Sequence, residues 1–246
     1  MTEMVCGCAA HSRRGFLRAS AGAFAALGGL GLAFRSDAVV LTKSLRDAMK
    51  PEDIVKAMKA GNQRFRTGQR QDHDYLAQQR KTAKGQYPPA VLLSCIDSRA
   101  PAETIMDLRI GDIFNCRVAG NIANEDILGS MEFACKIAGA KVVMVMGHTA
   151  CGAIKGAIDR VQLGNLTGLL TKIQPAVDAT AYQGERSAKN YVFVDAVARK
   201  NVELTMAEIH SRSAIIAALE TKGTVKIAGA MYNLESGVVD FLPSAR

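Results

Sequence analysis

Some residue types and motifs are absent or scarce in this sequence, and their absence counts against several classes of protein. The 246 residues contain no tryptophan, and aromatic residues make up only 5%. The formal charge of +8 would suit a nucleic-acid binder, but lysine and arginine are spread along the chain, which indicates a solvated basic surface instead. No glycine-rich phosphate loop and no C-x-x-C redox motif is present, so neither a nucleotide-binding protein nor a thiol oxidoreductase is favoured.

The sequence also lacks an apolar run with the length and hydrophobicity of a membrane span. The run from Ala19 to Phe34 is short and rich in alanine and glycine. It follows the paired Arg13 and Arg14 and a Phe-Leu, an arrangement that resembles a twin-arginine (Tat) signal peptide. We therefore expect residues 1–38 to be this leader, the Tat export machinery to be a partner, and the mature protein to be periplasmic.

Two tripeptides would suit cleavage of that leader. Ser36-Asp37-Ala38 and Gly31-Leu32-Ala33 both offer small residues at the expected places. We favour the first, which gives a mature start near Val39 and a single domain over residues 39–246.

Six cysteines in an exported chain would usually suggest disulfide bonds. A protein that folds in a reducing cytoplasm before export does not need them. Cys6 and Cys8 fall in the predicted leader, and Cys116 and Cys135 lie in apolar surroundings typical of buried small residues. Two cysteines then remain whose surroundings suggest chemistry.

The order of apolar segments predicts an α/β fold with a mostly parallel sheet. Short apolar runs bounded by glycine, proline and polar residues indicate four buried strands, at 90–96, 112–118, 141–147 and 225–231. Helical spacing predicts helices over 51–65, 125–140 and 201–223, with a polar connector over 67–89. A turn at 235–237 before the last apolar stretch predicts an antiparallel edge strand. Strands alternating with helices give a four-stranded parallel sheet flanked by helices.

A thiol, a carboxylate and a guanidinium follow the first predicted strand at every second position. In "SCIDSRAP" these are Cys95, Asp97 and Arg99. Alternate residues of an extended chain point to one face, so we expect the three side chains to face the same way.

A second group of candidate ligands follows the third predicted strand. In "GHTACG", His148 and Cys151 are three residues apart, and we expect them on one face of the first turn of a helix. Open α/β sheets gather their chemistry at the carboxyl ends of strands. If the two strands are neighbours, two thiolates and an imidazole converge there. This is the ligand set of a zinc site with its fourth position open.

The spacing C-x-D-S-R, followed some fifty residues later by G-H-x-x-C-G, resembles the β-class carbonic anhydrases. The resemblance extends from the "GNQRF" helix through "GDIFNCRVAGNIANEDILGSMEFA" to "GAMYNLESGVVDFL". It implies that Cys95, His148 and Cys151 bind one zinc ion per chain. It also implies that Asp97 and Arg99 form the neighbouring pair that orients the attacking hydroxide.

The same resemblance implies a function and a substrate pocket. Zinc-bound hydroxide would attack CO2 in a reversible hydration to bicarbonate and a proton, and Gln86, Phe114 and Gly152 would line the pocket. Members of the family are dimers or larger assemblies built on dimers, with sites at the subunit boundary. In some members the residue matching Asp97 becomes a fourth zinc ligand in a closed state. Members with a non-catalytic bicarbonate site have a tryptophan near the first cysteine, where this chain has Leu92 and no tryptophan. We therefore expect an open site at neutral pH and no such bicarbonate site.

Two other functions remain open at this stage. A non-catalytic zinc-binding module would explain the three ligands but gives no reason for the charged pair beside them. A CS2 or COS hydrolase on the same scaffold would use the same hydroxide on a linear analogue of CO2. The sequence also leaves the proton carrier open among His73, His210 and buffer.

Overall fold

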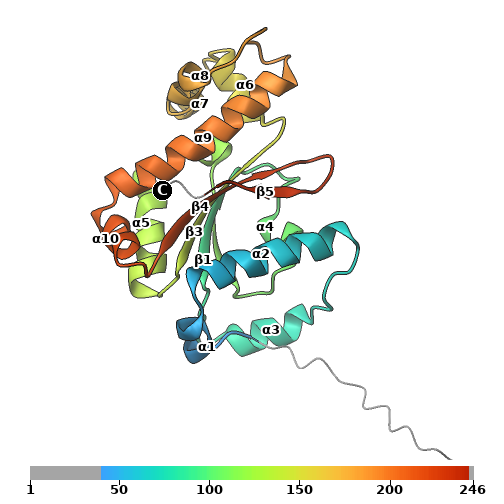
Figure 1. The fold of residues 1–246 in the computed structure, drawn as a ribbon, viewed down its shortest axis with the longest axis vertical. Coiled ribbons are helices and arrows are strands. Elements are labelled where there is room, and N and C mark those ends of the chain that lie inside the picture. Colours follow the sequence, from blue (N-terminus) through green and yellow to red (C-terminus); the bar gives the residue numbers. More distant parts are fainter. Residues whose placement is uncertain (1–39, 244–246) are drawn as a thin grey trace, which may run out of the picture. The chain divides into compact units, whose positions relative to one another are not determined.

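A five-stranded sheet forms the centre of residues 40–243, the part of the chain that this computed structural model describes (Figure 1). The strands stand in the order β2-β1-β3-β4-β5, and only β5 runs antiparallel to its neighbour. Their bounds are β1 Ala90–Ser94, β2 Ile113–Arg117, β3 Val142–His148, β4 Lys226–Tyr232 and β5 Val239–Phe241. The predicted fold class is confirmed. The predicted leader and both candidate cleavage sites lie outside the described residues.

Helices cover both faces of the sheet, so the central strands are buried on both sides. Every residue of β1 and β3 is buried, which explains why the sequence shows continuous apolar runs there. On one face Leu92 and Met144 belong to a core with α2 (Pro51–Arg66) and α4 (Ala102–Ile105). On the other face Val91 and Val145 belong to a core shared with α5 (Glu125–Glu132), α6 (Gly152–Ile158) and α9 (Tyr191–Arg212).

The remaining elements are short and lie at the margins of these layers. They are α1 Lys43–Ala48, α3 Tyr75–Thr82, α7 Gly164–Thr171, α8 Gln174–Ala179, α10 Ala214–Thr221, the 3-10 turn η1 Ala119–Asn121 and the π-helical turn η2 Phe133–Ile137. Among the described helices, none has the length and apolar character that crossing a membrane would require.

The helix α2 shows why the sequence patterns succeeded. Pro51 opens it, where a missing backbone N–H costs nothing, and acidic residues occupy its first turn and basic residues its last turn. Ile54 and Met58, one turn apart, are its buried apolar residues. The predicted helix over 51–65 is confirmed to within one residue.

Two predicted helices differ from the observed ones. The segment 201–223 is two helices, because Ser213 ends α9 and its hydroxyl accepts a hydrogen bond from the N–H of Ile216 at the start of α10. The segment 125–140 becomes a π-helical turn at Phe133, and a π turn does not keep the 3.6-residue spacing. Phe133 and Ile137, expected on the apolar face, are therefore 54% and 73% exposed. The connector over 67–89 also contains α3, which the sequence did not reveal.

The helix α1 is held at the amino end of β3. The guanidinium of Arg46 is buried and donates a hydrogen bond to the carbonyl of Ala138. The ammonium of Lys141, the residue before β3, donates to the carbonyls of Asp47 and Met49 at 2.6 and 2.8 Å. These contacts satisfy the carbonyl groups that a helix leaves free at its end.

Candidate metal centre

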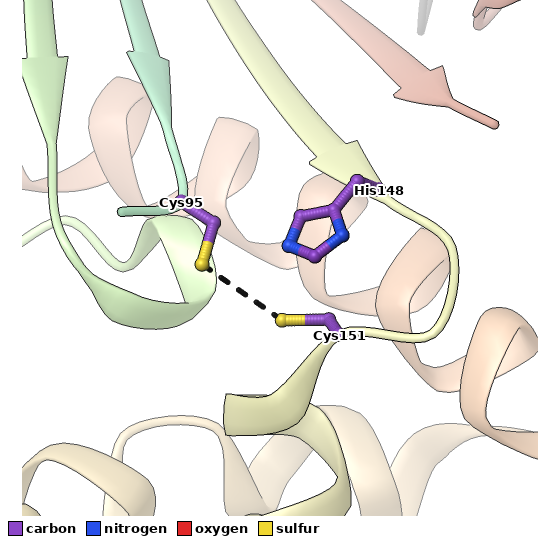
Figure 2. A group of neighbouring side chains, drawn as sticks. All are labelled: Cys95, His148 and Cys151. Atoms are coloured by element: carbon purple, nitrogen blue, oxygen red, sulfur yellow. Dashed lines mark hydrogen bonds between the residues drawn. The ribbon is translucent and has the colours of Figure 1, made fainter. Parts of the chain in front are cut away.

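Cys95, His148 and Cys151 come together at the carboxyl ends of β1 and β3. These strands are adjacent and parallel, so the residues that follow them meet at one edge of the sheet. The candidate ligand atoms of the three residues all lie within 4.8 Å of one another, and the two Sγ atoms are 4.0 Å apart. Figure 2 shows the three side chains converging from separate segments. The predicted convergence is confirmed.

The turn between His148 and Cys151 differs from the predicted one. His148 is the last residue of β3, and Cys151 is the N-cap residue of α6 rather than a residue inside it. The two therefore do not share one face of a helical turn. Thr149 and Ala150 reverse the chain between them (Figure 2), and Ala150 has a φ of 55°, in the left-handed region.

The imidazole of His148 is prepared to bind a metal ion through Nε2. Its Nδ1 lies 2.9 Å from the carbonyl oxygen of Thr149, which can only accept, so Nδ1 carries the proton. The lone pair is then on Nε2, which is buried and has no hydrogen-bond partner. A buried nitrogen without a partner is costly unless a ligand completes it. The donor set therefore fits a zinc ion.

The two thiols influence each other strongly because their sulfur atoms are in contact. The contact with Cys151 and a hydrogen bond from the Gly120 N–H lower the pKa of Cys95 to about 4, against the effect of burial. The same contact with Cys95, together with burial, raises the pKa of Cys151. One sulfur is thus readily a thiolate while the other keeps its proton. Thiolates are the forms that bind zinc, so a bound cation would favour ionisation of both.

Asp97 and Arg99 form a pair beside the cluster, but not along an extended chain. The strand β1 ends at Ser94, and the Asp97 carbonyl accepts a hydrogen bond from the Ala100 N–H, which closes a turn. The extended conformation expected for residues 95–99 is therefore wrong, yet Asp97 faces the cluster to which Cys95 belongs and pairs with Arg99. Arg99 donates from Nε to Oδ1 at 3.0 Å, from Nη2 to Oδ2 at 2.8 Å and from its backbone N–H to Oδ1 at 2.9 Å.

This pairing keeps Asp97 ionised and close to His148. The Arg99 side chain and then its backbone N–H lower the pKa of Asp97 to about 2, against the effect of burial. Oδ2 of Asp97 lies 3.8 Å from Nε2 of His148. The side chain of Asp97 is 14% exposed and that of Arg99 is 60% exposed, so the carboxylate faces the cluster while the guanidinium faces solvent.

Arg117, at the end of β2, is a residue of this centre that the sequence did not reveal. Its Nε donates to the carbonyl of Cys95 at 2.9 Å, and its Nη2 donates to the carbonyl of Asp97. Arg117 therefore fixes the backbone of the loop that presents a ligand and a carboxylate. No motif marks it, because these contacts depend on the pairing of β1 with β2.

The predicted pocket residues do not all reach the cluster within one chain. Gly152 follows Cys151 directly and has open space where a side chain would be. Phe114 pairs with Val91 on β1, four residues before Cys95, which is about 13 Å along a strand. Gln86 is exposed and precedes β1, on the side of the sheet away from the cluster.

The other two cysteines of the described segment lie apart from this group. Burial raises the pKa of Cys135 to about 12 and also raises that of Cys116. Cys135 is buried and Cys116 is partly buried. Both stay protonated thiols near neutral pH, as expected for small apolar residues. Within residues 40–243, the group with suitable spacing for a metal ion consists of Cys95, His148 and Cys151.

Comparison with known proteins gives a consistent result. A family model described as "Carbonic anhydrase" matches residues 90–239. "Carbonic anhydrase 2" of Mycobacterium tuberculosis is 34% identical over 189 residues, which cover 76% of this chain and 90% of that protein. A "Carbonic anhydrase" of Mycolicibacterium smegmatis is 33% identical over 192 residues, covering 77% of this chain and 92% of its own length.

Solved structures with the same fold include β-carbonic anhydrases. The enzyme CafA of Aspergillus fumigatus superposes with a TM-score of 0.59 at 26% identity, covering 68% of this chain and 81% of that one. The Coccomyxa β-carbonic anhydrase, in a structure with acetazolamide, gives a TM-score of 0.61 at 24% identity, covering 68% and 77%. The second likeness concerns the fold alone.

Proposed function

The chain belongs to the β-class carbonic anhydrase family, and on that premise we propose how its own residues carry out the reversible hydration of CO2. Cys95, His148 and Cys151 would hold a zinc ion, and Asp97 with Arg99 would direct the attacking oxygen. The proposal depends on one observation: the buried, unpartnered Nε2 of His148 faces two cysteine sulfurs within 4.8 Å.

The ligand set suits a catalytic rather than a structural zinc site. Three protein ligands leave a fourth position open, whereas structural sites usually close all four with protein side chains. When bound, a zinc ion lowers the pKa of a water in that position from about 15.7 to about 7, which makes hydroxide available near neutral pH.

Asp97 would orient the hydroxide that attacks the carbon of CO2. The carboxylate is ionised, so its oxygens can only accept hydrogen bonds. It would accept a hydrogen bond from the hydroxide, whose proton stays on its oxygen, and so turn the oxygen lone pair toward the substrate. Arg99 holds both carboxylate oxygens and thereby keeps Asp97 away from the ligand position itself, which supports an open site.

The decisive experiment combines activity with metal content on the same sample. We expect purified protein to contain about one zinc per chain and to hydrate CO2 in a stopped-flow assay. Asp97→Ala should keep the zinc and lower the rate by about a hundredfold or more, because it removes a group that acts on the reacting atoms.

A matched control tests whether any aspartate–arginine pair matters equally. Asp240 on β5 accepts from Nη1 of Arg199 at 3.0 Å, far along the chain from the cluster. Asp240→Ala should leave both rate and zinc content unchanged. If Asp97→Ala behaved like Asp240→Ala, the carboxylate would have no role in the reaction and the mechanism would be wrong.

We further propose that two chains complete each substrate pocket. Gly152 would contribute from the chain that holds the zinc, with its N–H as a donor to substrate oxygens. Gln86 and Phe114 would contribute from a second copy, since their own chain keeps them away from its cluster. The strand β2 is an outer strand of the sheet, with Phe114 packed edge-on to the exposed Phe133 beside it.

Known assemblies of related proteins support a dimer-based oligomer. Two β-carbonic anhydrases of Sordaria macrospora are described as tetrameric, and their fold matches with a TM-score of 0.58 at 24% identity. We expect a dimer or a multiple of it in sedimentation equilibrium. A monomer that is fully active at nanomolar concentration would contradict the shared pocket.

Export to the periplasm is a proposal supported by the sequence alone. The paired Arg13 and Arg14, the following Phe-Leu and the mild apolar run match a Tat leader. Replacing both arginines by lysine should leave the protein in the cytoplasm with an uncleaved leader. Equal amounts of both forms in the periplasmic fraction would contradict this route.

A further inference from the structure

Asp195 contacts the metal centre through the turn that separates two of its ligands. It lies on α9, and its Oδ1 accepts a hydrogen bond from the backbone N–H of Ala150 at 2.8 Å. Ala150 is the residue directly before Cys151. Asp195 itself touches none of the three ligands through a hydrogen bond or ion pair in the described part of the chain.

The conformation that this hydrogen bond holds is an unfavourable one. Ala150 has a φ of 55°, where the β-carbon of an L-residue approaches the backbone too closely. Glycine adopts this conformation freely, but this chain has alanine there. The turn therefore needs contacts from elsewhere to persist, and such contacts indicate that its shape matters.

The two halves of the turn are held from different sides. Next to His148, the N–H of Thr149 donates to the carbonyl of Tyr232 at 2.9 Å, and the Thr149 hydroxyl accepts from the N–H of Leu234 at 3.0 Å. These contacts come from β4 and the residues after it. The half that leads to Cys151 is held by Asp195 of α9.

We propose that Asp195 is a positioning residue for the zinc site: its carboxylate holds Ala150 in the left-handed conformation, so that Cys151 faces Cys95 before the metal ion binds. The inference rests on the proposed function, in which this cluster holds zinc. A ligand set that is already in place binds more tightly than one populated only part of the time. Loss of Asp195 should therefore weaken zinc binding.

The test measures zinc affinity instead of activity. Metal-stripped full-length protein competes with a chromophoric chelator for zinc at fixed pH, and the dissociation constant is compared among variants. Asp195→Ala should weaken binding about 10- to 100-fold, as loss of an outer contact to a ligand segment commonly does. Glu203→Ala, which removes a more exposed carboxylate from the same helix, should change it less than about twofold.

A second substitution separates positioning from general stabilisation. Ala150→Gly removes the strain that Asp195 opposes, so adding it to Asp195→Ala should recover most of the lost affinity. A purely structural role predicts a lower melting temperature of the metal-free protein, an unchanged zinc dissociation constant and no recovery. Asp195→Asn is a second test, because its amide oxygen still accepts from the Ala150 N–H but carries no charge. Its zinc affinity should stay within about threefold of the unaltered protein; a loss as large as that of Asp195→Ala would mean that the charge acts instead of the hydrogen bond, and the inference would be overturned.

The outcomes also distinguish this inference from the function on which it rests. If the unaltered protein binds no zinc, the proposed function fails. If the unaltered protein binds zinc and Asp195→Ala binds it equally well, only the positioning role fails. If Asp195→Ala binds more weakly and Ala150→Gly does not rescue it, Asp195 does not act through the conformation of the turn, and the inference is overturned.

Discussion

Two buried histidines in this protein have opposite surroundings. Nε2 of His73 lies 3.0 Å from Oδ1 of Asp107, whose side chain is fully buried. The other oxygen of Asp107 accepts from Nε of Arg64 at 2.5 Å and from the backbone N–H of Gln71 at 3.1 Å. This group joins α2 and the segment after it to the loop that follows α4. Both oxygens of its carboxylate have partners.

His148 is equally buried, but its Nε2 has no partner among the described residues. Two histidines with the same degree of burial therefore differ in whether their nitrogen atoms are satisfied. A buried histidine whose nitrogen has a hydrogen-bond partner, such as His73, stabilises the fold. A buried nitrogen without a partner, such as Nε2 of His148, indicates that a ligand is missing.

Removing a zinc ligand from the cluster around His148 should have the largest effect on activity. Cys95→Ala deletes one of the three zinc ligands, so we expect loss of zinc and a CO2 hydration rate at the uncatalysed level. The fold should persist, as measured by circular dichroism. Cys116→Ala is the control, since that thiol lies outside the cluster. Equal zinc loss in both variants would mean that the cysteines act through folding.

Breaking the ionic group around Asp107 should lower the stability of the fold and leave zinc binding and CO2 hydration intact. Asp107→Asn removes the charge that Arg64 and His73 face, and loss of one partner from a buried ionic group costs about 3 kcal/mol of unfolding free energy. Urea denaturation measures this loss. Zinc content and hydration rate of the folded variant should match those of the unaltered protein; a large fall in either would show that the two groups are coupled.

The stability that Asp107 provides should depend on pH in a defined direction. Burial raises its pKa, but hydrogen bonds from Arg64, the Gln71 N–H and His73 outweigh burial and give a net lowering. A lowered pKa means that the unfolded chain binds protons more readily, so stability is present above the ordinary carboxylate range and is lost as pH falls below about 4. The difference between the unaltered protein and Asp107→Asn should therefore shrink on acidification. A constant difference between pH 7 and pH 3 would contradict this.

The sequence predicted the strands and the cluster well because both depend on short-range patterns. All four parallel strands lie within two residues of the expected bounds. Continuous apolar runs predict strands that are buried on both faces, which is confirmed for β1 and β3. It is wrong for β2, an outer strand of the sheet with no fully buried residue. Parallel strands bring their carboxyl ends to one edge. Cys95 and His148 could therefore be placed together from their positions after two strands.

Two features of the metal centre that the sequence did not reveal depend on contacts between distant segments. The left-handed turn at Ala150 is held by a carboxylate 45 residues away, and Arg117 reaches the Cys95 loop only because β2 lies beside β1. The end of α9 at Ser213 is a local signal that could have been recognised, since a serine that caps a helix is common. We expected an extended strand to bring Asp97 and Arg99 together, but a turn does so.

The two ends of the parallel strands have different roles: one end anchors α1, and the other carries the metal ligands. Arg46 and Lys141 hold this helix at the amino end of β3, while His148 closes the other end. The seven residues of β3 span about 20 Å between them. A linker joined ahead of α1 would therefore approach the sheet from the end remote from the catalytic cluster. A chain tethered in this way would be held on the side opposite its own metal ligands.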